Sequence, residues 1–406
     1  MTQLCRHCAT PLSIEFLDLG FAPPSNAYLH PDDLKKPEVT FPLRLLACGT
    51  CRLVQTEDYA ASDALFTDDY AYFSSTSSGW LKHAASYVDM VTARLGLGAE
   101  SHVIEVASND GYLLKNFVTK GIPCLGIEPT QGTADAARDL GIPVVQEFFG
   151  SALAPSLSPA DLIIGNNVYA HVPDIKDFTA ALSDVLKPEG VITLEFPHLM
   201  QLVQHRQFDT VYHEHFSYLS LLAVTRTFAA AGLRIFDVEE LPTHGGSLRI
   251  FGCHDNAGHV QSDAVALLLE QEIARGMDGD AYYQSFQEQA NEVKDDFVRF
   301  LLQAKADGKS VAAYGAAAKG NTIMNYAGVR SDLIPFVCDA AAAKIGKLMP
   351  GSHIPILPPS ALRERRPDYL VILPWNIAAE VKNQCSDLSA LGTQFVTAVP
   401  KLTVTQ

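Results

Sequence analysis

Two histidines, a glutamate and two tyrosines lie within seven positions, in the stretch YHEHFSY at residues 212–218. A neutral imidazole, with an unperturbed pKa of about 6.5, accepts a proton at neutral pH, and a tyrosine hydroxyl donates a hydrogen bond to an oxygen that gains charge. The stretch therefore suits acid–base chemistry. Two other interpretations stay open. One is a transition-metal site, although the spacing is not H-E-x-x-H, and the other is a polar turn whose side chains hydrogen-bond one another.

Four of the eight cysteines form two Cys-x-x-Cys pairs, CRHC and CGTC. Each pair can close a turn on one metal ion, and four thiolates complete the tetrahedral site that zinc prefers. The 39 residues between the pairs exceed the usual spacing of a zinc ribbon. Redox-active pairs are the alternative, but a thioredoxin-like βαβ context is lacking. The sequence therefore predicts a structural zinc site made by Cys5, Cys8, Cys48 and Cys51.

A second polar group lies in VIEVASNDGYLL, where an apolar stretch typical of a buried strand runs into a polar turn and then a helix. The first strand-to-helix turn of an α/β sheet lies at the carboxyl edge, where ligands bind. This turn lacks G-x-G-x-x-G, and its acidic side chains suit a positively charged ligand better than a pyrophosphate. The residues expected to contact that ligand are Glu105, Ala107, Ser108, Asn109, Asp110 and Gly111.

The next apolar stretch ends in GIEPT, which places Glu128, followed by Pro129, 18 residues after Asp110. An acidic side chain at this point can bind both hydroxyls of a ribose. A cation and a ribose together predict S-adenosylmethionine, which is an adenosyl sulfonium. The alternative is that these acidic residues only cap helices and that NDG is only a turn.

Two further stretches are expected to complete the same site. QEFF offers Glu147 and Phe148 beside an adenine, although a core role is equally compatible with its two phenylalanines. NNVYAHVPD follows the third strand, where Asn166 and Asn167 can close over the methionine part of the ligand.

Two glycine-containing stretches predict contacts to a second, larger ligand. In PTHGGSLRIFG a turn precedes a strand, and its candidate binding residues are His244, Gly246, Ser247 and Arg249. In VAAYGAAAKGNT a strand runs into a helix, and a helix N-terminus with a lysine can hold a diphosphate; the candidates are Gly315, Lys319 and Asn321. A hairpin turn with an exposed arginine and a tight packing turn are the respective alternatives.

The elements that must position these residues follow from hydrophobic periodicity. After an amphipathic stretch at 79–95, the apolar stretches HVIEVA, PCLGIEP, ADLIIGNN and GVITLEFP alternate with helical ones, which indicates a doubly wound parallel sheet. A long helical region at 261–305 follows, and the alternation then restarts with SVAAYG, IPFVCDA and DYLVILPW. The predicted fold class is α/β, with a zinc module, an α/β domain and a second, smaller α/β domain.

Composition narrows the class of protein. The chain of 406 residues is 48% hydrophobic, and 30 basic against 46 acidic residues give a formal charge of −16. An acidic total opposes binding to nucleic acid or to an anionic membrane surface. No apolar run approaches 18 residues, and the first ten residues lack the basic and apolar regions of a signal peptide. We therefore expect a cytoplasmic protein with no nucleic-acid or membrane partner.

The motifs together carry a resemblance. With both cysteine pairs, EVASNDGYLL, GIEP, NNVYAHVPD, YHEHFSYLS and HGGSLRIF in this order, the chain resembles the bacterial sugar C-methyltransferases over essentially its whole length. The resemblance implies a zinc-binding module (1–68), an S-adenosylmethionine domain (69–255) and a Rossmann-like domain (256–406) that helps hold a nucleotide sugar. It also implies methylation, most often at C-3, next to the keto group of a dTDP- or GDP-linked 4-keto-deoxysugar. We expect a monomer or a weak homo-oligomer.

Methylation at carbon requires a carbanion, and an adjacent ketone makes the carbon acidic enough to form one. A base must take the α-proton while donors stabilise the enolate oxygen. The resemblance places these roles in YHEHFSY, with His215 as base, Tyr212 as donor to the keto oxygen and Glu214 orienting a histidine or binding a sugar substituent. His171 is a second donor, whereas His213 is expected to be structural. Tyr70 and Tyr72 are both candidates for a substrate-facing tyrosine of the family.

Three other functions compete with this one. An oxidoreductase using the last domain for a nicotinamide is disfavoured, because G-x-G-x-x-G is missing at 315–320. A non-enzymatic zinc adaptor has no use for the donor-binding turn and YHEHFSY together. The closest rival is an O- or N-methyltransferase, which needs a base and proximity but no enolate.

Overall fold

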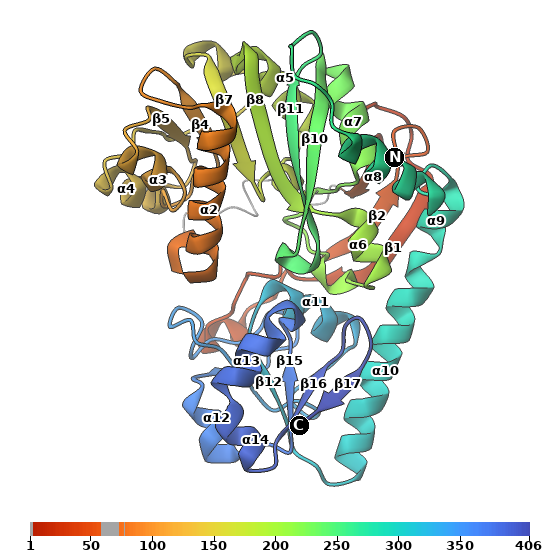
Figure 1. Cartoon of the computed structure of the whole chain (residues 1–406). Helices are drawn as coiled ribbons and strands as arrows, with labels where there is room; N and C mark the ends of the chain where they lie inside the picture. Colours follow the sequence, from red (N-terminus) through yellow and green to blue (C-terminus); the bar gives the residue numbers. More distant parts are fainter. Residues whose placement is uncertain (1–2, 58–72, 77) are drawn as a thin grey trace.

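The computed structural model describes residues 3–57, 73–76 and 78–406 and contains three sheets (Figure 1). The N-terminal sheet is antiparallel and has the order β1-β2-β3-β9. Its strands are β1 (Ile14–Ala22), β2 (Phe41–Ala47), β3 (Val54–Thr56) and β9 (Ser217–Tyr218). The fourth strand thus comes from the YHEHFSY stretch, so the zinc module and the candidate acid–base loop share one sheet.

The central sheet has seven strands in the order β10-β11-β8-β7-β4-β5-β6. The strands from β8 to β6 run parallel, and β11 and β10 add an antiparallel edge. The order places the topological switch point between β4 and β7, which is where ligands bind in such sheets. The bounds are β4 (Val103–Val106), β5 (Cys124–Ile127), β6 (Val144–Val145), β7 (Ala160–Asn166), β8 (Leu186–Pro197), β10 (Leu233–Leu241) and β11 (Ser247–His254).

Both faces of the central sheet are buried, which explains the continuous apolar stretches seen in the sequence. In β7, Leu162 and Ile164 contribute to the core on one face, whereas Ile163 points into the core on the other. On the first face lie α2 (Ser78–Leu95), α3 (Leu114–Thr119) and α4 (Gln131–Asp139). On the second lie α5 (Ile175–Val185) and α7 (Leu221–Ala230). The expected doubly wound arrangement is confirmed.

The C-terminal sheet has six strands in the order β14-β13-β12-β15-β16-β17, all parallel except β17. Its strands are β12 (Val311–Tyr314), β13 (Val337–Cys338), β14 (Ile356–Leu357), β15 (Tyr369–Ile372), β16 (Gln394–Thr397) and β17 (Thr403–Thr405). Its helices are α11 (Ala318–Tyr326), α12 (Ser360–Arg365), α13 (Ala378–Gln384) and α14 (Ser386–Ala390). A second switch point therefore lies between β12 and β15.

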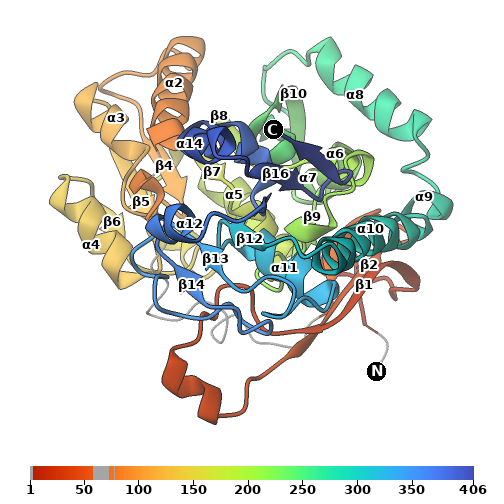
Figure 2. The same ribbon diagram turned by 90° about the horizontal axis from the view of Figure 1, so that it is seen from below.

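The predicted long helical region consists of α8 (Asp263–Ala274), α9 (Asp280–Gln284) and α10 (Phe286–Ala306). Helix α8 packs on α7 and β10 of the central domain, and α9 and α10 contact β1. Figure 2 shows α10 running alongside the N-terminal sheet toward the C-terminal domain. The helices after residue 256 thus join the three sheets, and their apolar residues belong to one continuous core.

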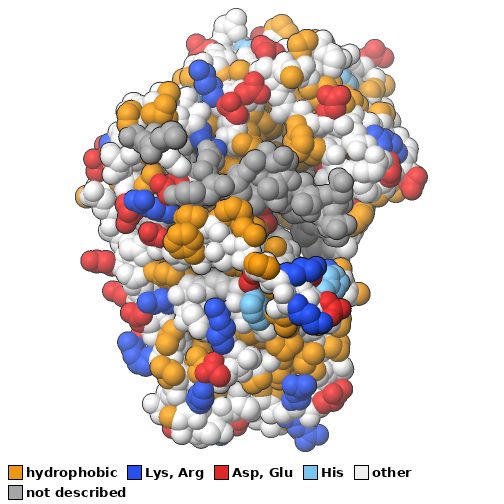
Figure 3. Space-filling model, turned by 180° about the vertical axis from the view of Figure 1, so that it is seen from behind, with side chains coloured by type: hydrophobic (Ala, Val, Ile, Leu, Met, Phe, Trp, Pro, Cys, Tyr) orange, Lys and Arg blue, Asp and Glu red, His pale blue; other side chains and the backbone are white. Residues whose placement is uncertain are grey.

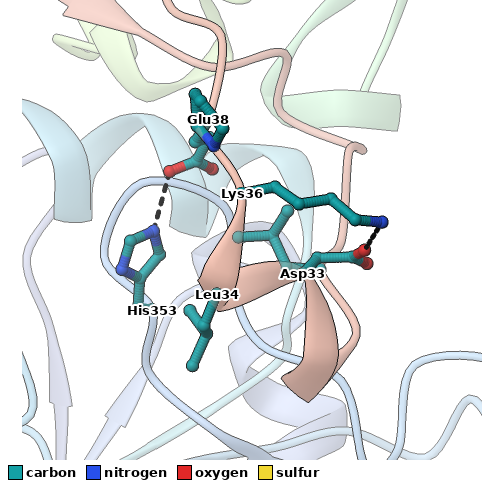
Figure 4. A pocket seen from close by; sticks show the side chains of 7 residues that line it. Asp33, Leu34, Lys36, Glu38 and His353 are labelled. Atoms are coloured by element: carbon teal, nitrogen blue, oxygen red, sulfur yellow. Dashed lines mark hydrogen bonds and ion pairs between the residues drawn. The ribbon is translucent and has the colours of Figure 1, made fainter.

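The N-terminal module also reaches the C-terminal domain. Leu29 bridges Leu348, and the Tyr28 hydroxyl donates to the Ala316 carbonyl at 2.6 Å. The short 3₁₀ helix η1 (Pro31–Lys35) borders a shallow pocket of about 280 Å³. Figure 4 shows two of its lining residues in contact, the Glu38 carboxylate and His353, at 2.7 Å. The module is therefore fixed to both larger domains.

On the face drawn in Figure 3, basic and acidic side chains are interspersed, and the coloured residues form no continuous basic patch. Within the described residues, no helix is both long and apolar enough to cross a membrane.

Candidate active site

The two Cys-x-x-Cys pairs come together as one cluster. The four sulfur atoms all lie within 4.8 Å of one another, with 3.4 Å between Cys5 and Cys51 and 3.5 Å between Cys8 and Cys48. Zinc with Zn–S bonds of about 2.3 Å places tetrahedral sulfurs about 3.8 Å apart. Hydrogen bonds from the Cys5 and Cys51 thiols lower the pKa of Cys48, which favours its thiolate. The side chains therefore fit the predicted structural zinc.

Local backbone geometry builds this cluster. Ala9 and Arg52, each directly after a Cys-x-x-Cys pair, have φ angles of 57° and 66°. Their N–H groups donate to the carbonyls of Cys5 and Cys48, so each turn closes around two cysteines. Gln55 donates from Nε2 to the Cys5 sulfur at 3.4 Å. Such outer hydrogen bonds orient metal-binding sulfurs.

The turn after β4 has the conformation that its residue types predict. Asn109 has a φ of 49° and Gly111 a φ of 75°, and a Cβ on Gly111 would lie 2.4 Å from Cδ1 of Ile142. Glu128, just beyond β5, accepts hydrogen bonds from the N–H groups of Asn109 and Thr130, each at 3.0 Å. The ends of β4 and β5 are therefore joined beside the switch point.

Several buried polar atoms at this edge are unsatisfied. Within the described part of the chain, no hydrogen-bond partner is present for Glu105 Oε2, Ser108 Oγ, Asp110 Oδ1 or either amide atom of Asn166. Burial, together with the nearby Glu128 and Asp110 carboxylates, raises the pKa of Glu105 well above its usual value. Unpaired polar atoms, together with a carboxyl group whose ionisation is disfavoured until a cation approaches, fit a ligand that brings both hydrogen-bond donors and a positive charge. This edge therefore fits S-adenosylmethionine.

The two phenylalanines of QEFF have different environments in the structure. Phe149 stacks edge-on against Phe178, at 5.1 Å between ring centroids, and belongs to the core. Phe148 is 67% exposed and Glu147 is also exposed, so the core alternative holds for one phenylalanine and not for the other. Asn167, with a φ of 56°, donates its N–H to the Glu195 carbonyl beside the turn.

YHEHFSY places three rings in contact. The centroid of His215 lies 4.0 Å from that of Tyr212 and 4.5 Å from that of His171, which comes from the NNVYAHVPD loop. Burial lowers the pKa of His171 to about 4. Burial, with His171 and His244 nearby, lowers the pKa of His215 well below its usual value. Both imidazoles are therefore neutral at physiological pH.

Hydrogen bonds define what each ring can do. Nδ1 of His171 lies 2.8 Å from the Glu214 carbonyl, so it carries the hydrogen, and Nε2 of the neutral ring is an acceptor. The predicted donor role of His171 thus requires its protonated form. The neutral ring of His215 has one nitrogen without a hydrogen, which is the acceptor that a base needs.

Glu214 and His213 anchor the loop to the N-terminal module. Glu214 accepts from Asn26 at 3.2 Å, and burial raises its pKa to about 7. Its backbone, not its carboxylate, orients His171. Nε2 of His213 lies 3.2 Å from the Pro42 carbonyl in β2, which agrees with the expected structural role. Tyr70 and Tyr72 lie outside the described residues.

The arginine of the PTHGGSLRIFG stretch, Arg249, forms ion pairs inside the protein. Arg249 donates to Glu195 from Nε at 2.8 Å and from Nη2 at 2.5 Å, and to Glu239 from Nη1 at 2.7 Å. The Glu195 carboxylate also contacts His83 at 2.8 Å. Arg249 is therefore part of a buried network of ion pairs and is not an exposed charge. Ser247 Oγ likewise donates to the Thr243 carbonyl.

Glu195, His83 and Trp80 are site residues that the sequence analysis missed. Glu195 is 1% exposed at the carboxyl end of β8, and its signal was a single charge in the apolar stretch VITLEFP. On α2, Trp80 stacks on His83 at 4.8 Å and contacts His244 at 5.6 Å. Helix α2 thus contacts the turn that contains His244 through an aromatic ring. In that turn, a Cβ on Gly246 would lie 2.7 Å from Gln201.

The C-terminal domain reaches the same region. Trp375 donates from Nε1 to the buried Asp209 carboxylate at 2.7 Å, three residues before Tyr212. Lys319 lies 4.5 Å from the centroid of the Trp375 ring and donates to Asn376 at 3.0 Å. Its charge acts on His215 and on His244, lowering the pKa of both. A basic residue from the last domain therefore lies near the candidate base.

The second switch point forms a cavity of about 290 Å³. Gly315 borders it after β12, where a Cβ would lie 2.4 Å from Pro374, and Asp339 borders it after β13. Asn321 is instead fully buried and donates to the Ser25 carbonyl at 2.6 Å, so it fixes the N-terminal module to α11.

Comparison with known proteins gives consistent matches. Family profiles match a zinc binding domain at residues 5–66, a methyltransferase domain at 80–238 and a C-methyltransferase C-terminal domain at 242–400. C-methyltransferase NovU of Streptomyces niveus is 32% identical over 98% of this chain and 95% of its own length. The magnesium protoporphyrin IX methyltransferase ChlM of Synechocystis PCC 6803, solved with bound S-adenosylmethionine, covers 44% of this chain and 80% of its own at 13% identity and a TM-score of 0.35.

Proposed function

Because the chain belongs to the bacterial C-methyltransferase family, we propose that it methylates the carbon next to the keto group, at C-3, of a nucleotide-linked 4-keto-6-deoxysugar through an enolate. The observation that carries the proposal is the contact of the buried, neutral His215 with both Tyr212 and His171. Methylation at a carbon next to a keto group requires a base, whereas a protein that only binds a ligand does not.

The proposed proton transfer uses the unprotonated ring nitrogen of neutral His215. The electron pair of the α C–H bond moves into the carbonyl group, the proton moves to the imidazole, and the oxygen becomes an enolate. Tyr212 donates a hydrogen bond to that oxygen. Nearby Lys319 and the imidazolium formed at His215 offset its negative charge. The low pKa of His215 in the empty site favours a neutral base before the substrate binds.

The methyl donor is held beside this group. Glu105, Asp110 and Asn166 would contact the methionine part and Glu128 the ribose, in accordance with their strand ends. S-adenosylmethionine, when bound, supplies an electrophilic methyl group to the enolate carbon. Burial of the turn excludes water, which strengthens each electrostatic contact in the site.

The proposed nucleotide site is the cavity between β12 and β15. Asp339 follows the second strand of that sheet, where an acidic side chain suits ribose hydroxyls. A cavity of about 290 Å³ suits part of a nucleotide, and Lys319, at the start of the helix that follows β12, is the residue proposed for the diphosphate. The zinc has a structural role in this proposal, held by the four cysteines of the N-terminal module.

Mass spectrometry tests the proposal. The protein, S-adenosylmethionine and a panel of dTDP- and GDP-linked 4-keto-6-deoxysugars are incubated, and controls without donor are incubated in heavy water. We expect one sugar to gain a methyl group at the carbon that exchanges deuterium in the control. Methylation of a sugar whose keto group has been reduced would instead indicate O- or N-methylation, and fragmentation would locate the group.

Glu105→Gln is expected to weaken binding of S-adenosylmethionine about tenfold, a loss of about 1.4 kcal/mol, because it removes the buried carboxyl group that can ionise beside the bound sulfonium. S-adenosylhomocysteine, a neutral thioether, should lose much less affinity. Calorimetric titration of both ligands measures the contrast, with Glu100→Gln as the exposed control. An equal loss for both ligands would show that Glu105 only maintains the shape of the turn.

A further inference from the structure

Arg6 connects the zinc module to the loops that hold both histidines. It lies inside the first Cys-x-x-Cys pair, and its Nη2 donates to the Thr56 carbonyl at 3.1 Å while Nη1 donates to the Pro173 carbonyl at 2.9 Å. Its guanidinium carbon is also 4.9 Å from the centroid of Phe216. Its backbone N–H donates to Gln55 at 2.9 Å, so the arginine is tied to β3 at two points.

The three partners belong to the segments that define the candidate acid–base pair. Phe216 directly follows His215, and its carbonyl accepts from the Thr56 N–H at 3.2 Å, at the junction of β3 with β9. Pro173 lies two residues after His171. One guanidinium therefore contacts the loop of each histidine and the zinc-module strand between them.

We propose that Arg6 is a positioning residue that sets the distance and angle between His171 and His215. A planar guanidinium can donate to two carbonyls while its face packs on an aromatic ring, which a lysine ammonium cannot do. The two rings lie 4.5 Å apart at an interplanar angle of 77°, and their loops are also joined by the hydrogen bond from His171 to the Glu214 carbonyl. This inference rests on the proposed function, in which these rings act on the substrate.

The consequence is a functional reason for the zinc module. Closing the first pair of cysteines on zinc fixes the backbone of Arg6, and its side chain contacts Thr56 in β3, 50 positions away, and Phe216. A misplacement of about 1 Å in a catalytic geometry can lower the rate about 10²-fold. Loss of Arg6 should therefore affect turnover far more than binding.

The experiment compares Arg6→Gln, Arg6→Lys and Arg52→Gln in the full chain. Arg52 is the matched control, because it adjoins the second cysteine pair and its ion pair is with Asp280, away from both histidine loops. For each protein, zinc content, the Kd of S-adenosylmethionine, hydrogen exchange of peptides covering 169–174 and 212–218, and kcat and KM for the accepted sugar are measured.

We expect Arg6→Gln to keep zinc and donor binding within about twofold, to lower kcat 10- to 100-fold with little change in KM, and to speed exchange in both peptides. Arg6→Lys should recover part of kcat, and Arg52→Gln should behave like the parent. Unchanged exchange in both peptides, loss of zinc from Arg6→Gln and Arg6→Lys, or an equal fall in kcat for Arg52→Gln would overturn the inference. Because exchange requires no substrate, failure of the proposed sugar reaction would appear separately, as absent turnover in the parent.

Discussion

Replacing His215 by alanine is expected to lower kcat about 10³-fold, because proton transfer by a positioned base contributes about 10²–10⁴-fold. The donor should still bind with nearly its original affinity, since the acidic turn after β4 lies on different strands. Deuterium exchange at the α-carbon, measured without donor, should disappear together with methyl transfer. Steady-state kinetics and mass spectrometry of the same samples measure both effects.

His213→Ala is the matched control, two positions away in the same loop. Its imidazole contacts the Pro42 carbonyl rather than the rings of Tyr212 and His215, so kcat should remain within about tenfold of the parent value. If both variants lose activity equally, or if His215→Ala loses donor binding too, His215 maintains the loop rather than acting as base.

The pH profile follows from the same residue. Burial and the neighbouring His171 and His244 lower the pKa of His215 well below its ordinary value, so the ring loses its proton at a lower pH than a free imidazole. Activity should therefore not decline on account of this group as pH falls from 8 to 6, and the acid limb should begin below its ordinary pKa of about 6.5. An acid limb at or above that value that is lost in His215→Ala would contradict the depressed pKa.

Cys48→Ser is expected to abolish stoichiometric zinc binding and to unfold or strongly destabilise the N-terminal module. Zinc binding in small domains is worth about 10–16 kcal/mol of folding free energy, so even a third of it, about 4 kcal/mol, is large for a single substitution. Because β9 completes the module's sheet, the YHEHFSY loop should lose order as well. Metal analysis, thermal unfolding and hydrogen exchange of residues 212–218 measure these effects.

Cys124→Ser serves as the control, because Cys124 is a partly buried thiol in β5 outside the metal cluster. It should keep one zinc per chain and lose little stability. Full zinc content in Cys48→Ser would refute the four-cysteine site, and unchanged exchange of the loop would show that the sheet is maintained without the metal.

Much of the fold was predictable because the signals are local. Apolar stretches of strand length, separated by helical ones, predicted the parallel order of the central sheet, and both faces of β7 are buried as such a stretch requires. The turn at Asn109 to Gly111 was predictable for the same reason, since backbone conformation there depends on residue type. These patterns depend on neighbours within a few residues.

The predicted roles that changed depend on distant partners. In the sequence Arg249 is a positive charge available to a ligand, but in the structure it pairs with Glu195, 54 positions away. Asn321 is expected to bind a ligand at the start of a helix, but it donates to the Ser25 carbonyl instead. His171 was expected to donate, but the Glu214 carbonyl fixes its hydrogen on Nδ1. Side-chain type gives capacity for a contact, whereas burial and long-range pairing decide whether that capacity is used.

The sequence by itself determined the chemistry available: four thiols at zinc spacing, an acidic donor turn and a cluster of histidine and tyrosine, because each is a short pattern with its own geometry. Tertiary structure alone decided that β9 joins the zinc module, that Arg6 reaches both histidine loops and that Trp375 and Lys319 approach the same site. The physical reason is that contacts between sheets form where separate apolar faces share one core, and no local pattern specifies which loops that packing brings together.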